Sequence, residues 1–70
     1  MDTNERVKLA EKISRTETAI RTATSALQTF AKDPVLNAAA MQAKQQEKTE
    51  LEAKLKELKR ELLQDEIDSL

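Results

Sequence analysis

Apolar side chains recur along the first half of the chain at alternating intervals of four and three residues. They fall at Leu9, Ile13, Ile20, Leu27 and Phe30, with Thr16 and Ala23 in the intervening positions. This is the heptad repeat of a helix that packs along its length against another helix. Asp2 precedes the segment and Glu5 follows three residues later, which is a helix-start signature. The pattern predicts a helix over about 3–32.

Large aliphatic residues continue in the second half of the chain, but their spacing is less regular. The predicted stripe has consecutive steps of four residues in its middle, and it runs through Leu36, Ala40, Ala43, Glu47, Leu51, Leu55, Leu58 and Leu62. Such spacing is typical of a stutter, at which a coiled-coil seam straightens. The pattern predicts a second helix over about 34–68, with the charged Glu47 on its inner face.

The segment between the two stripes contains the only proline of the chain, and the chain has no glycine. Pro34 disfavours the helical conformation of the residue before it, so the first helix is expected to end here. Asp33 is a good N-cap, and Pro34 fits the first position of a helix, where its missing N–H costs nothing. The sequence therefore predicts a tight turn at 32–34 between two antiparallel helices.

Folding the two stripes about this turn predicts which residues meet. Large side chains face one another near the termini, and small ones do so near the turn. The acidic end of the second helix is expected beside Arg6 and Lys8, which offset the negative end of its dipole. The predicted pairs are Phe30 with Leu36, Leu27 with Ala40, Ile20 with Glu47, Ile13 with Leu55, and Leu9 with Leu58.

Length and composition limit how such a chain completes its core. Seventy residues make one small domain, 39% of them hydrophobic and only one of them aromatic. Two helices bury one stripe each, and chains of this size rarely build a sufficient core alone. We therefore expect an all-α fold, a single coiled-coil-like antiparallel two-helix hairpin over 1–70, which completes a four-helix bundle by self-association.

The composition also restricts the chemistry. The chain has no histidine and no cysteine, and its net charge is −1. The usual general base, the commonest metal ligand and any thiolate site are thus missing. We expect no enzyme and assign no catalytic residue, cofactor or metal ligand. With no long apolar run and no signal-peptide pattern, the expectation is a cytoplasmic protein without a membrane partner.

The strongest functional signal is the leucine-rich end of the hairpin. It offers a wider apolar surface than one internal seam needs, and wide apolar surfaces mark interaction sites. The expected partner is a second copy of the chain or another helical protein; the competing interpretation is that these residues only form the internal seam. The candidate interface comprises Leu9, Ile13, Leu51, Leu55, Leu58, Leu62, Leu63 and Ile67.

A basic face on the first helix gives a second interpretation, which is contact with RNA or DNA phosphates. It comprises Arg6, Lys8, Lys12, Arg15 and Arg21. Glutamates are interleaved with these residues, and no aromatic side chain there is placed to stack on bases. A solvated, ion-paired face is therefore the favoured interpretation, with nucleic acid as the alternative.

The layout resembles two families of short helical hairpins. The stretch Ala26-Leu27-Gln28-Thr29-Phe30-Ala31-Lys32-Asp33-Pro34, a helix end that runs into a proline turn, resembles the small co-chaperones of type III secretion needle subunits. Size and layout are also similar to the Rop family of plasmid copy-number regulators, RNA-binding hairpins that dimerise into four-helix bundles. The first resemblance implies a non-enzymatic chaperone, adaptor or regulator that acts through helix packing. The second implies a dimeric RNA- or DNA-binding regulator, although no RNA-contacting position transfers to this sequence.

Overall fold

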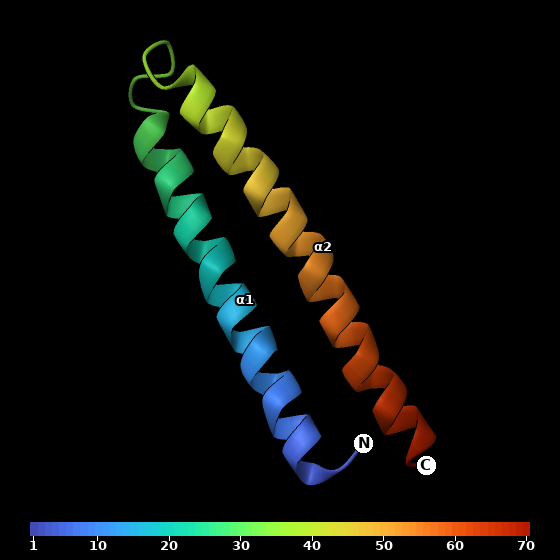
Figure 1. Cartoon of the computed structure of the whole chain (residues 1–70). Coiled ribbons are helices and arrows are strands. Elements are labelled where there is room, and N and C mark those ends of the chain that lie inside the picture. The colour runs from blue at the N-terminus through green and yellow to red at the C-terminus, as the bar shows by residue number, and fades with distance from the viewer.

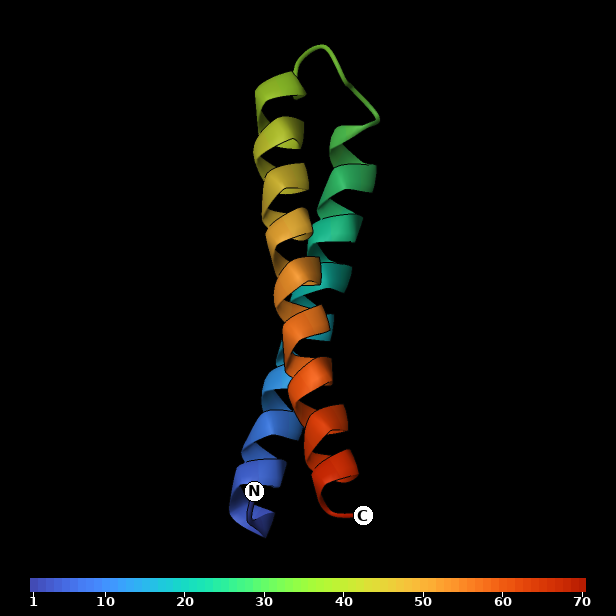
Figure 2. The same cartoon turned by 90° about the vertical axis from the view of Figure 1, so that its right-hand side faces the viewer.

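The computed structural model describes residues 1–70 as two antiparallel helices joined by one turn (Figure 1). Helix α1 spans Thr3–Phe30 and helix α2 spans Ala38–Asp68. The predicted all-helical hairpin is thus confirmed. The molecule is a rod of 52 × 15 × 12 Å, with both termini at one end. The helices lie side by side and cross at a shallow angle (Figure 2). Neither of them has the length and apolar character that crossing a membrane requires.

The start of α1 follows from local capping. The Asp2 carboxylate accepts a hydrogen bond from the Glu5 backbone N–H at 2.8 Å, as the sequence predicts. Threonines, which are weak helix formers, turn their hydroxyls back onto the helix. Thr16 donates to the Lys12 carbonyl at 2.7 Å, and four other threonines do the same four residues back along their helices. These bonds let Thr16 lie buried in the seam without an unpaired polar atom.

The turn is longer than the sequence predicts. Helix α1 ends at Phe30, not at residue 32, and α2 begins at Ala38, not at residue 34. The predicted N-cap of the second helix is wrong, because Asn37 and not Asp33 immediately precedes α2. The Asp33 carboxylate instead accepts from the Leu36 N–H at 3.2 Å, and its carbonyl accepts from the Asn37 N–H at 3.0 Å. These bonds close a single turn that does not continue into α2. The side-chain amide of Asn37 donates a hydrogen bond to the Phe30 carbonyl at 3.2 Å and so links the two helix ends.

Two local turns account for the longer connection. The N–H groups of Lys32 and Asp33 donate to the carbonyls of Thr29 and Phe30, and the turn closed by Asp33 follows before the chain enters α2. Val35 and Leu36 lie in this connection and are 90% and 79% exposed. The predicted placement of Leu36 in the seam of the second helix, opposite Phe30, is therefore wrong.

The core lies at the end of the rod that carries the termini. Leu9, Ile13 and Leu58 form the buried cluster, and Leu55 and Leu62 pack against it. Leu9 and Leu58 thus share one cluster, as do Ile13 and Leu55, in agreement with the predicted register. Fully burying one such side chain stabilises the fold by about 1.5–3 kcal/mol. Toward the turn, the buried seam of α1 consists of small residues, Thr16 and Ala23.

The inner face of α2 differs from the prediction over its first half. Ala40, Ala43 and Glu47 are exposed, so their predicted placement on the buried inner face of α2, opposite Leu27 and Ile20, is wrong. The buried and half-buried residues follow a regular heptad without a stutter: Met41, Lys44, Lys48, Leu51, Leu55, Leu58, Leu62 and Asp65.

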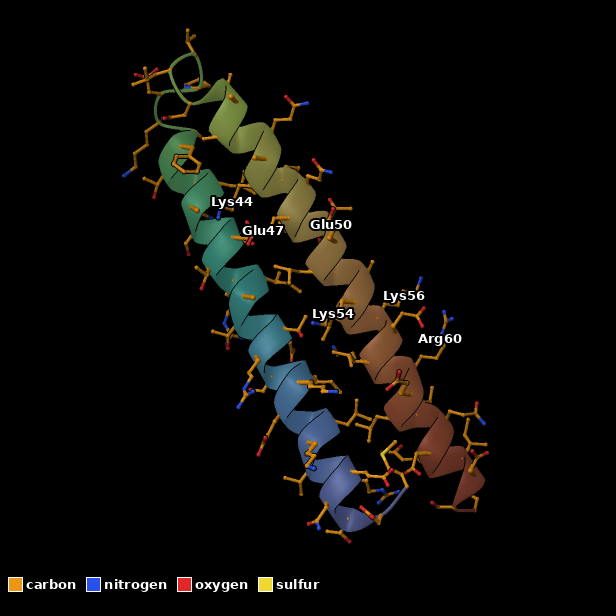
Figure 3. The ribbon with its side chains drawn as sticks, viewed as in Figure 1. Lys44, Glu47, Glu50, Lys54, Lys56 and Arg60 are labelled. Atoms are coloured by element: carbon orange, nitrogen blue, oxygen red, sulfur yellow. The ribbon has the colours of Figure 1, made fainter.

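Two lysines occupy this seam because the opposite side chains are small. The methylene stem of a lysine covers apolar surface while its ammonium group reaches polar surroundings. Lys44 does this beside the small-residue stretch of α1, and its Nζ lies 3.0 Å from Glu47 Oε2. Figure 3 shows Lys44 and Glu47 reaching from α2 toward α1, whereas Lys56 and Arg60 project from the outer side of α2.

Candidate interaction surface

The two edges of the helix seam are not equally covered. With 3.6 residues per turn, seam residues seven positions apart line the same edge. One edge, here called the closed edge, contains five of the six buried residues, Leu9, Thr16, Ala23, Leu58 and Asp65. Its other seam residues, Phe30, Lys44 and Leu51, are half-buried. The other, the open edge, contains mostly half-buried residues: Ile20, Leu27, Met41, Lys48, Leu55 and Leu62. Ile13 is the one buried residue of the open edge. The hairpin therefore has one side on which its apolar seam remains partly uncovered.

A shallow groove marks the middle of the open edge. Ile20 of α1 and Leu55 of α2 form its apolar lining, and Glu52, Lys56 and Lys59 complete it. A cross-helix ion pair lies on the same side, with Lys59 Nζ 4.0 Å from Glu17 Oε2. The groove thus combines an apolar floor with a charged rim, which is the pattern of protein interfaces.

Exposed apolar residues extend this side toward the termini. Val7 on α1 is 50% exposed and Leu63 on α2 is 57% exposed. Both occupy the heptad position that directly follows an open-edge position in the sequence, about 100° around the helix from that edge. Ile67, 52% exposed, follows one turn after Leu63 on the outer face of α2.

The candidate interface predicted from the sequence is divided by the fold. Leu9, Ile13 and Leu58 are buried inside the hairpin. Leu51, Leu55 and Leu62 are half-buried, and Leu63 and Ile67 are exposed. The open edge adds Ile20 and Leu27, which the sequence assigns only to the internal seam. The heptad spacing reveals both edges of a seam, but it does not tell which edge the second helix leaves uncovered.

An ion cluster at the termini joins the two ends of the chain. Asp65, 8% exposed, accepts a hydrogen bond from Arg6 Nε at 2.6 Å, and the Met1 ammonium lies 3.1 Å from its other oxygen. The hydrogen bond from Arg6, followed by that from the N-terminus, lowers the pKa of Asp65 below its usual range. The carboxylate in turn raises the pKa of the Met1 amino group.

This cluster confirms that the acidic end of α2 lies beside Arg6. Lys8, the second expected partner, makes no ion pair with that end. Asp65 is a seam residue that a pattern of apolar side chains does not reveal, although it continues the regular spacing of Leu55, Leu58 and Leu62. Because Arg6 is held by Asp65, the predicted basic face of α1 has one cation fewer for a nucleic acid.

Comparisons with known proteins gave no relative. The chain matches no protein-family model, no curated protein and no solved structure. The resemblance to co-chaperone and Rop-type hairpins therefore stays a prediction from the sequence.

Proposed function

We propose that this chain is a non-enzymatic interaction protein that works by helix packing. Its open edge receives further helices, and two copies of the hairpin complete a four-helix bundle. In this role it serves as a small chaperone, adaptor or regulator.

The observation that carries the proposal is the incomplete burial of the hairpin's own seam. Ile20, Leu27, Leu55 and Leu62 stay half-buried, and no large side chain in the hairpin is fully buried. A domain of this size buries few apolar side chains, so leaving seam residues exposed to water removes a large part of its folding free energy. Covering them with another helix recovers roughly 25 cal/mol for each Å² of apolar surface removed from water.

The rim of the open edge supports the same proposal. Glu17, Glu52, Lys56 and Lys59 surround an apolar groove and include both signs of charge. Charged groups of both signs at the border of an apolar patch contribute orientation and partner choice more than raw affinity.

Sedimentation equilibrium of the full chain over a wide concentration range tests the proposal. The expected result is a mass that rises from that of the 7.9 kDa chain to twice that value, with the helical circular-dichroism signal retained. A chain that stays at the monomer mass at every concentration and remains stably folded contradicts self-association.

A further inference from the structure

We propose that the open edge is covered by a second copy of this chain in parallel orientation, with both turns at the same end. Helix α1 of each copy then lies over α2 of the other. This inference rests on the proposed self-association and adds the orientation and the facing residues.

Symmetry leaves two ways to place one open edge on another with full overlap. Homodimers pair the same surface on both copies through a two-fold axis. An axis along the rod gives a parallel pair in which α1 faces α2. An axis across the rod gives an antiparallel pair in which α1 faces α1 and α2 faces α2. The charges on the open edge distinguish these arrangements.

The parallel arrangement brings opposite charges together. Glu17 and Lys59 already lie at the same level of the rod, because their side chains meet within the hairpin at 4.0 Å. In a parallel pair, Glu17 of each copy therefore faces Lys59 of the other copy. The pairs Arg6–Asp65 and Glu17–Lys59 fix which part of α2 lies level with each α1 residue. By this relation Arg21, whose guanidinium donates to the Thr18 hydroxyl on its own helix, is level with the part of α2 that contains Glu52.

The antiparallel arrangement brings like charges together. Glu17 lies near the midpoint of α1, which spans Thr3–Phe30, and Glu52 lies near the midpoint of α2, which spans Ala38–Asp68. Full overlap therefore places each glutamate opposite its own counterpart. Like-charge juxtaposition at an interface disfavours a pairing by up to several kcal/mol.

The apolar residues favour the same choice. Val7 follows Arg6, and Leu63 lies two residues before Asp65, so the Arg6–Asp65 bond places them at the same end of the rod. A parallel pair gathers Val7, Leu62 and Leu63 of both copies into one cluster. An antiparallel pair places this end over the turn half of the rod, where the open edge of α2 presents Lys48 beside Met41.

Distances between spin labels test the orientation directly. The chain contains no cysteine, so Lys32→Cys labels only the turn and Thr18→Cys labels only the middle of α1. Both positions are exposed. Helix axes in contact lie about 8–10 Å apart, so labels on the two turns of a parallel pair are expected within about 30 Å of each other. An antiparallel pair separates them by nearly the 52 Å length of the rod.

The Thr18→Cys label is the matched control, since a mid-rod position gives a separation well below the rod length in either orientation. Coupling at both positions, with a short distance between the turns, supports the proposal. Mid-rod coupling together with a turn separation near the rod length overturns the parallel orientation and leaves self-association standing. No coupling at either position, with a monomer mass, overturns both.

Discussion

Arg6 and Asp65, separated by almost the whole chain, meet through a hydrogen bond of 2.6 Å from the guanidinium Nε to the carboxylate. The Asp65 side chain is almost fully buried, and the Met1 ammonium occupies its second oxygen. This ion cluster closes the end of the rod opposite the turn. It also sets the level at which α1 and α2 pack, because it joins the first turn of one helix to the last turn of the other.

The first prediction is that acid weakens the hairpin through Asp65. The folded-state pKa of this group is lowered from its ordinary value of 3.8. Its stabilising effect is therefore fully present above about pH 4 and is lost as the pH falls through the lowered folded value. Thermal unfolding followed by circular dichroism is expected to show a lower melting temperature in acid. Asp65→Asn is expected to reduce stability at neutral pH and to flatten this dependence.

Asp68→Asn is the matched control, because Asp68 lies on the same last turn but is exposed. It is expected to leave the acid dependence intact. An acid dependence that is equal in the wild type and in Asp65→Asn would refute the assignment.

The Met1 amino group predicts a second pH dependence, on the alkaline side. Because its pKa is raised in the folded chain, its ion pair with Asp65 stabilises the fold fully below pH 8.0. This stabilisation is lost as the pH rises through the raised pKa.

A second prediction concerns the apolar residues that the hairpin leaves exposed. Leu63→Asp places a charge beside the open edge without touching the buried cluster. It is expected to weaken self-association at least about tenfold, which corresponds to about 1.4 kcal/mol, with the helical content unchanged. Gln46→Asp introduces the same charge at an exposed position on the outer face of α2 and is expected to have little effect. Equal losses in the two variants, measured by sedimentation equilibrium, would rule out the proposed surface.

The lysines of the seam give a third prediction. Lys44 occupies an inner position of α2, where it pairs with Glu47. Lys44→Leu replaces a snorkelling side chain with one that remains fully apolar, and it is expected to raise the free energy of unfolding by about 1 kcal/mol. Gln46→Leu, at an exposed position on the outer face of the same helix, serves as the control and is expected to change the free energy of unfolding by less than about 0.5 kcal/mol. A destabilised Lys44→Leu variant would show that the ammonium group is required in the seam.

Much of the fold follows from the sequence by simple rules. The heptad of α1 appears in the spacing of Leu9, Ile13 and Ile20, and the Asp2 cap is recognisable from its distance to Glu5. The turn at Asp33 and the graded core follow in the same way. In each case the type of residue and its position in the sequence predict the same local structure.

The inner face of α2 is harder to predict, because two of its residues are charged although they line the seam. Lys44 and Lys48 are polar by composition, but their stems are apolar, so a search for apolar residues assigns the seam to Ala40 and Ala43 instead. Asp65 was missed because a buried carboxylate is stable only beside a partner, here Arg6, from the far end of the chain. The open edge does not follow from the spacing, since it depends on how α2 is rotated about its own axis relative to α1.

The central claim, that another chain covers the open edge, is tested most directly by cysteine protection in this cysteine-free protein. Ile20→Cys places a thiol on the open edge, and Thr22→Cys places one at an exposed position half a turn away. Reaction with a thiol reagent is measured as the protein concentration rises through the association range. Ile20→Cys is expected to become progressively protected, while Thr22→Cys reacts at a constant rate. A rate for Ile20→Cys that is independent of concentration while the chain associates would contradict the claim.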